Sequence, residues 1–179
     1  MKKFQFLFLG IVLFSFVIGC KDKDDDKIYL EFLKSGYIKV NLTGTSSDGI
    51  SLNEALTFDS YVSIDEATFD TTKTPTENYK TFNLSRGIGA GNQYVNLGFE
   101  MHDGGLIENA EVYLNFTKNM SDNQLLSTSF YCNNENGSTL NLTNVKYENN
   151  TITGNFTGKY EKINLSGDFN LPVYQEINK

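Results

Sequence analysis

The chain has 179 residues, with 15 basic and 22 acidic side chains and a formal net charge of −7. This length suits one ordinary domain, and the acidic balance argues against nucleic acid as a partner, because proteins that bind it usually present a basic patch or stripe. One histidine and two cysteines supply few ligands for multi-ligand zinc, haem or iron–sulfur sites, so the sequence predicts no metal and no cofactor.

Residues 1–19 have the architecture of a secretory signal peptide. Two lysines near the start precede an apolar stretch over residues 4–17, and the small residue Gly19 stands just before Cys20. The apolar stretch is shorter than the roughly 20 residues that a membrane-spanning helix needs. A positive start, a short apolar stretch and a small residue at the end are typical of a cleaved export signal.

The sequence Val17-Ile18-Gly19-Cys20 resembles the lipobox of bacterial lipoproteins. The resemblance implies that Cys20 is acylated and becomes the first residue after cleavage. One acyl chain binds a membrane only marginally, and lipoproteins of this class carry two or three, palmitate among them. We therefore expect Cys20 to be a lipid anchor; an ordinary signal peptide followed by a chance cysteine is the alternative.

Residues 20–27 are expected to form the lipidated cysteine and a charged tether. Residues 21–27 are all charged, so they cannot bury apolar surface and should remain solvated. The segment is similar to the acidic export signal that follows the lipidated cysteine in surface-exposed lipoproteins of Bacteroidota, although any polar spacer would also fit. The resemblance implies an outer-membrane protein that is lipid-anchored and surface-exposed, with a periplasm-facing location as the alternative.

Residues 28–179 are predicted to form a single all-β domain. Apolar and polar residues alternate with a period of two through most of this range, which is the pattern of half-buried strands. Clusters of glycine, asparagine, aspartate and serine separate about nine such runs. At most, residues 106–110 could form one helical turn. We expect an antiparallel β-sandwich of about nine short strands, with a small lipocalin-like barrel as the alternative.

The residues expected to face the core share one parity within each run. In chain order they are Ile38, Val40 and Leu42; Leu56, Phe58, Val62 and Ile64; Phe82 and Leu84; Val95, Leu97, Phe99 and Met101; Val112, Leu114 and Phe116; Leu126, Thr128, Phe130 and Cys132; Leu140 and Leu142; Val145 and Tyr147; Ile152, Gly154 and Phe156; Ile163, Leu165 and Phe169. The parity changes between Leu142 and Val145, which predicts a β-bulge near Thr143 and Asn144.

Glycine and phenylalanine recur near the end of the chain, at Gly154, Phe156, Gly158, Gly167 and Phe169. The two runs that contain them are expected to pair as a closing hairpin. This ending resembles the C-terminal hairpin of small Bacteroidota lipoproteins of uncharacterised function, a likeness that covers some twenty residues.

Amides, hydroxyls and tyrosines are expected on the solvent side of the strands. The triplet Asn-Leu/Phe-Thr/Ser occurs six times, at Asn41, Asn83, Asn115, Asn141, Asn155 and Asn164. Its plain interpretation is strand patterning; the alternative is a surface that hydrogen-bonds sugars, whose faces would pack on flat aromatic rings. Tyr94, Tyr61 and Tyr113 are the candidate ligand-binding residues, since each falls on the polar side of its run, although exposed tyrosines also stabilise sheets as cross-strand neighbours.

The sequence predicts no catalytic residues. A serine hydrolase needs a base that is held by a carboxylate and aimed at a nucleophile, and here the single histidine, His102, is expected in a surface turn. The acidic side chains around it, Glu100, Asp103, Glu108 and Glu111, are expected to be solvated, although a hydrolase is not excluded. Cys132 is expected to be a buried core residue, because a reactive thiol needs a cationic neighbour.

A modification site and a function complete these predictions. Asp70-Thr71-Thr72 looks like the O-glycosylation sequon of exported Bacteroidota proteins, which makes Thr71 a candidate acceptor. The chain is expected to be a membrane-anchored, non-catalytic binding or accessory module at the cell surface, with a glycan or a protein as ligand. The alternative is a structural envelope subunit that partners another membrane protein.

Overall fold

The computed structural model describes residues 35–47, 49–60, 68–70, 79–88, 93–119, 125–135 and 137–175. These residues form strands, turns and short connections, without a helix in the described ranges. The strands in chain order are β1 (Tyr37–Thr45), β2 (Ser51–Phe58), β3 (Thr68–Asp70), β4 (Tyr79–Gly87), β5 (Tyr94–His102), β6 (Ile107–Asn119), β7 (Leu125–Cys132), β8 (Thr139–Glu148), β9 (Thr151–Tyr160), β10 (Ile163–Pro172) and β11 (Tyr174–Gln175).

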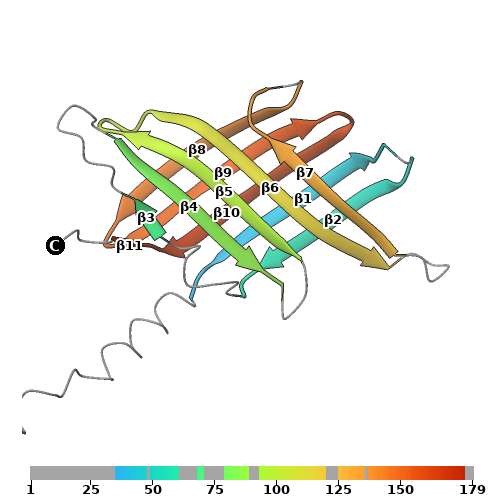
Figure 1. Ribbon diagram of the computed structural model, residues 1–179, viewed down its shortest axis with the longest axis horizontal. Helices are drawn as coiled ribbons and strands as arrows, with labels where there is room; N and C mark the ends of the chain where they lie inside the picture. The colour runs from blue at the N-terminus through green and yellow to red at the C-terminus, as the bar shows by residue number, and fades with distance from the viewer. Residues whose placement is uncertain are drawn as a thin grey trace, which may run out of the picture. The chain divides into compact units, whose positions relative to one another are not determined.

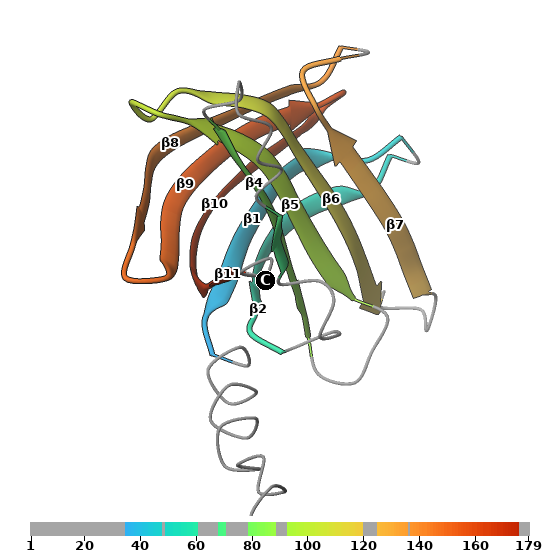
Figure 2. The same ribbon diagram turned by 60° about the vertical axis from the view of Figure 1, so that its left-hand side comes forward.

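The strands make two sheets that pack face to face (Figures 1 and 2). A five-stranded sheet has the order β2-β1-β10-β9-β8, and a six-stranded sheet has the order β11-β3-β4-β5-β6-β7. All pairings are antiparallel except the short contact of β11 with β3. The two sheets stay separate within the described residues, so the predicted β-sandwich is confirmed and the chain does not adopt the lipocalin-like barrel. Nine of these strands match the predicted number, although they are longer than the short strands expected, and β3 and β11 are short additions.

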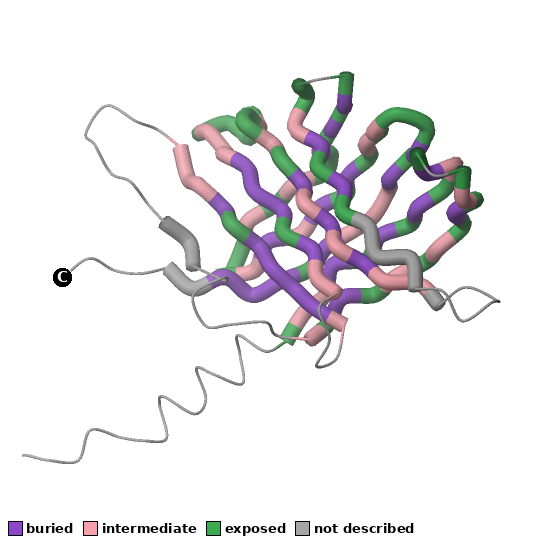
Figure 3. The backbone as a smooth tube through the Cα atoms, turned by 45° about the vertical axis from the view of Figure 1, so that its right-hand side comes forward, coloured by how far each residue is buried: buried purple, intermediate pink, exposed green. Residues whose placement is uncertain are grey.

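The core lies between the sheets, where the alternating apolar residues of both layers meet. Buried and exposed positions follow one another along the strands in Figure 3, because successive side chains of a strand point to opposite faces. Phe82 stacks on Phe99 with 5.1 Å between ring centroids, and Phe116 stacks on Phe130 at 5.9 Å. The buried apolar residues are Ile38, Val40, Leu42, Leu52, Phe58, Phe82, Leu84, Val95, Leu97, Phe99, Val112, Leu114, Phe116, Phe130, Cys132, Leu140, Leu142, Ile152, Phe156, Ile163, Leu165, Phe169, Leu171 and Val173.

Two predictions about strand limits differ from the structure, and others fall on residues that it does not describe. The second strand begins earlier than the pattern indicated: β2 is Ser51–Phe58, and the expected inward residues Val62 and Ile64 lie outside the described residues. The possible helical turn at residues 106–110 is wrong, because β6 already begins at Ile107. The predicted signal peptide, charged tether, Tyr61 and Thr71 also lie outside the described residues.

The bulge predicted in the eighth strand is confirmed. The register of β8 on β9 shifts between Thr143 and Lys146. Asn144 has a φ of 54°, in the left-handed region that asparagine tolerates better than most residues, and its side-chain amide donates to Asn155 Oδ1 at 3.3 Å. The extra residue lets Leu142 and Val145 both turn toward the core.

The closing hairpin is also confirmed, and its glycines have a packing role. Phe156 of β9 lies directly opposite Gly167 of β10, and Phe169 of β10 lies directly opposite Gly154 of β9. Each phenylalanine ring covers the glycine across from it. A Cβ atom on Gly154 would lie 2.5 Å from Phe169 Cζ, and one on Gly167 would lie 2.4 Å from Phe156 Cζ. We call these two pairs the glycine–phenylalanine pairs.

One charged residue, Arg86, occupies a core position. It follows Phe82 and Leu84 on the inward face of β4 and is 1% exposed. Its Nη1 donates to the Ser85 carbonyl at 2.7 Å, and its Nη2 donates to the Ser35 carbonyl at 2.9 Å. A buried guanidinium needs hydrogen-bond partners, and here one of its bonds joins β4 to Ser35, two residues before β1.

We predict that Gly154→Ala lowers the free energy of unfolding by about 1–3 kcal/mol, because overpacking forces a ring or a strand to move. In a Phe169→Leu background the added cost of Gly154→Ala should fall by on the order of 1 kcal/mol, since the two residues share one contact. Urea unfolding of the four variants measures both values. Thr157→Ala, an exposed change on β9, is the control; equal costs of Gly154→Ala in the two backgrounds would show that the ring is not the obstacle.

We also predict that Cys132 is inert in the folded protein. The residue is fully buried, and burial raises the pKa of its thiol to about 11, so at about pH 8 the thiol is both protonated and shielded. In full-length chain carrying Cys20→Ser, a maleimide reagent should label Cys132 only after guanidinium chloride unfolds the protein. Rapid labelling under native conditions would contradict the core assignment.

Candidate functional site

Three tyrosines lie on adjacent strands of the six-stranded sheet, on its outer face. Tyr94 belongs to β5, Tyr113 to β6 and Tyr131 to β7. The ring centroids of Tyr94 and Tyr113 are 5.6 Å apart, with 32° between the ring planes. Tyr113 is directly opposite Tyr131 in the pairing of β6 with β7. We call these three residues the tyrosine row.

The alternation of the strands places the row there. Val95, Val112 and Cys132 turn into the core, so the tyrosines next to them in the chain turn outward. The same parity brings amides beside the rings, because Asn96 pairs with Tyr113 and Asn115 pairs with Tyr94. The row is therefore a flat aromatic surface with amide groups interleaved.

Hydrogen bonds hold two of the phenol groups. The Tyr113 hydroxyl donates to Ser129 Oγ at 3.1 Å, and the Tyr131 hydroxyl donates to Glu111 Oε2 at 2.6 Å. The bond to Glu111 is the main reason that the pKa of Tyr131 is raised above its usual value. Tyr131 is 44% exposed, so its ring stays open to a ligand while its hydroxyl is fixed.

The structure thus brings together two of the three tyrosines proposed from the sequence. Tyr94 and Tyr113 lie side by side, while Tyr61 is outside the described residues. Tyr131 was missed, although its place between Phe130 and Cys132 implies an outward ring.

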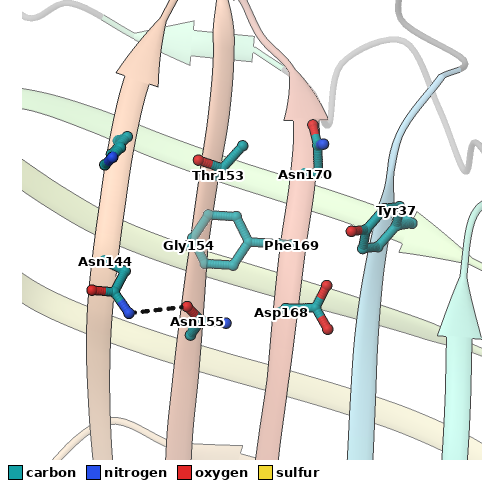
Figure 4. A pocket seen from close by; sticks show the side chains of 9 residues that line it. Tyr37, Asn144, Thr153, Gly154, Asn155, Asp168, Phe169 and Asn170 are labelled. Atoms are coloured by element: carbon teal, nitrogen blue, oxygen red, sulfur yellow. Dashed lines mark hydrogen bonds between the residues drawn. The ribbon is translucent and has the colours of Figure 1, made fainter.

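A second polar surface lies on the outer face of the five-stranded sheet. It is a shallow recess of about 330 Å³ where the bulge of β8 meets β9, β10 and β1 (Figure 4). Amide, hydroxyl and carboxylate side chains lie around Gly154 in this view, and the Phe169 ring seen beside Gly154 is itself buried in the core. The lining residues are Tyr37, Asn144, Lys146, Thr153, Gly154, Asn155, Asp168, Phe169 and Asn170.

Tyr37 forms one side of this recess, and sequence analysis did not single it out. Its hydrogen bond to Asp168 is the main cause of a raised pKa of the phenol. The Lys39 ammonium lies 4.4 Å from the ring centroid, within cation–π range. One face of the ring is therefore already occupied, which makes Tyr37 a weaker stacking platform than the tyrosine row.

A third cluster contains the single histidine. The acidic residues expected to be solvated around His102 divide into two groups, because Glu100 and Glu108 converge on the imidazole while Asp103 and Glu111 are not part of that cluster. Ligand atoms of Glu100, His102 and Glu108 all lie within 4.8 Å of one another. These are residue types that could hold a metal ion.

Comparison of the chain with protein-family models, curated proteins and solved structures finds no match. Among the described residues, no helix has the length and apolar character needed to cross a membrane. No function therefore comes to this chain from a relative.

Proposed function

We propose that this chain is a membrane-anchored lipoprotein whose β-sandwich is a non-catalytic binding module at the cell surface, with a glycan bound along the tyrosine row. The observation that carries the proposal is the ring contact of Tyr94 with Tyr113 on an outer sheet face, with 5.6 Å between the ring centroids and with Tyr131 opposite Tyr113.

The chemistry of the row matches that of a sugar chain. One face of a sugar ring carries C–H groups that pack on aromatic rings, and its hydroxyls need donors and acceptors at the edge. The tyrosine rings supply the C–H packing surface. Asn96 and Asn115, which pair with members of the row, and Ser129, which accepts a hydrogen bond from Tyr113, supply the polar groups. Tyrosine also loses little conformational entropy on binding, because its side chain has few rotatable bonds.

The open surface predicts modest affinity. Deep pockets bury most of a small ligand, whereas a flat sheet face contacts one side of a chain. We expect dissociation constants on the order of 0.1–1 mM per module, or about −4 to −5.5 kcal/mol. Several copies on one membrane would strengthen attachment to a long polymer.

Binding without hydrolysis fits the same geometry. Hydrolases gain much of their rate in sites that exclude water. The carboxylate beside the row, Glu111, accepts a hydrogen bond from Tyr131, and Glu108 is 51% exposed. These groups lie on an open sheet face, which favours a binding role.

The proposed location rests on the sequence of the leader. The lipobox-like Val17-Ile18-Gly19-Cys20 provides a lipid attachment, and the charged residues 21–27 provide a spacer of on the order of 25 Å when extended. Such a spacer leaves the sandwich free to meet an extracellular polymer. A surface-exposed outer-membrane lipoprotein is the arrangement that these features favour.

We predict that Tyr94→Ala and Tyr113→Ala each weaken glycan binding about tenfold, which corresponds to about 1.4 kcal/mol. A glycan array of the full chain identifies the ligand, and titration calorimetry then gives the affinities. Tyr37→Ala is the matched control, because it removes a tyrosine from the outer face of the other sheet and should leave binding unchanged.

Two results would contradict the glycan proposal. Loss of binding in Tyr37→Ala but in neither row variant would transfer the site to the recess. A blank array at high protein concentration, with a stoichiometric membrane protein recovered by pull-down, would favour the structural envelope subunit instead.

We predict that Cys20→Ser abolishes acyl labelling and moves the protein out of the membrane fraction, because the thioether link cannot form. In cells that make the wild-type chain, external protease should remove the sandwich without lysis. Acyl labelling that survives in Cys20→Ser would refute the lipobox, and a domain that is digested only after lysis would place it on the periplasmic side.

A further inference from the structure

The only histidine of the chain lies in a ligand-like cluster on the β5–β6 hairpin. Glu100 and His102 are two residues apart on β5 and share its outer face, and Glu108 lies directly opposite Glu100 on β6. The His102 Nε2 atom is 3.0 Å from Glu108 Oε2. One nitrogen and two carboxylates thus converge from two adjacent strands.

A β-bulge produces this convergence. The register of β5 on β6 shifts between Gly98 and Glu100, and Asn109 adopts a left-handed φ of 49°. Without the extra residue, the pairing of Gly98 with Glu111 would bring Asn109, not Glu108, opposite Glu100. Bulges re-aim side chains in this way and are over-represented next to functional sites.

Neighbouring residues hold two of the three side chains in place. The Asn109 amide donates to Glu100 Oε2 at 2.7 Å. The Tyr79 ring lies against the His102 ring, with 5.2 Å between centroids. Metal sites typically have such outer contacts, which orient the ligands before the ion binds.

Two features of the cluster are unfavourable without a cation: the carboxylates repel each other, and the histidine nitrogen lacks a good hydrogen bond with the described residues. Like charges directly opposite each other destabilise an antiparallel pair, and Glu100 and Glu108 are such a pair. The His102 Nε2 atom is covered from solvent, and its 3.0 Å contact with Glu108 Oε2 does not have the geometry of a hydrogen bond. A cation bound by all three groups would compensate the carboxylates and use the nitrogen.

We propose that Glu100, His102 and Glu108 bind a divalent transition-metal ion of the zinc type. Imidazole nitrogen with carboxylate oxygen suits such ions, and three protein ligands leave one position for water. Calcium is disfavoured because it takes six to eight oxygen ligands. Ligand atoms around zinc lie about 2.0–2.2 Å from the ion. The ligand atoms of the three side chains now lie within 4.8 Å of one another. Small rotamer changes would bring all three to that distance from a shared ion.

The metal site is separate from the proposed glycan surface. Glu100 is six residues from Tyr94 along β5, about 20 Å at the rise of a strand. The ion would fasten the two strands of the hairpin at the end far from Tyr94. Its existence does not rest on the glycan proposal.

Titration of untagged full-length chain with ZnCl₂ tests the site. We expect one saturable ion per chain with a micromolar dissociation constant, a raised Tm, and a visible d–d absorption band when Co²⁺ replaces Zn²⁺. His102→Ala and Glu108→Gln should each weaken binding at least about tenfold. Glu111→Gln, which changes a glutamate on the same face of β6 outside the cluster, should bind as wild type does.

Glu108→Gln keeps the shape of a half-exposed side chain, so it separates loss of a ligand from loss of fold. Zinc binding that persists in both His102→Ala and Glu108→Gln would overturn the assignment. So would the absence of saturable binding to wild-type chain, or a preference for Ca²⁺ over Zn²⁺. Glycan binding by wild-type protein is measured in separate samples with and without EDTA, so either proposal can fail alone.

Discussion

The register of β9 on β10 is the constraint on which the five-stranded sheet depends. The glycine–phenylalanine pairs lie at the centre of that sheet, where each ring needs the space that the opposite glycine leaves. A slip of one residue would turn Phe156 and Phe169 toward water and Asn155 and Asp168 toward the core, which period-two geometry makes very costly. Because β1 pairs with β10 and β8 pairs with β9, both neighbouring strands inherit this register, and so does the polar recess on the outer face.

The six-stranded sheet uses the same alternation for a different surface. Val95, Leu97 and Phe99 fill the core, and the residues between them give β5 an outer face that runs from Tyr94 through Asn96 to Glu100. One bulge then changes the parity of β6, so that an aromatic row at one end and a histidine–glutamate cluster at the other share a continuous surface. Strict alternation thus produces the tyrosine row, and the one extra residue in the bulge of β6 produces the cluster of Glu100, His102 and Glu108.

Sequence patterning predicted the fold class and the approximate number of strands, because burial on one face imposes a period of two. The β8 bulge was visible, since apolar residues on both sides of Thr143 changed parity. The β6 bulge was hidden, because the stretch from Ile107 to Glu111 alternates poorly and even allowed a helical turn. Arg86 could not be assigned to the core, because its burial depends on a distant carbonyl, that of Ser35. Sheet order was equally out of reach, since the pairing of β1 with β10 joins distant parts of the chain.

For the candidate site too, the sequence predicted which residues face outward but not which of them lie together. Tyr94 and Tyr113 followed from strand parity, but their 5.6 Å approach required knowing that β5 and β6 are neighbours. The composition argued against a metal because only one histidine is present, and that argument treats ligands as if they had to be of one type. A sheet can bring ligands of different types together without a dedicated loop. Two residues two positions apart on one strand, and one residue opposite them on the next strand, share a face and lie close together. Counts of histidine and cysteine therefore limit only the sites that need several residues of one of these types. A His–Glu–Glu set depends instead on strand register, and here the left-handed Asn109 in the bulge of β6 sets that register.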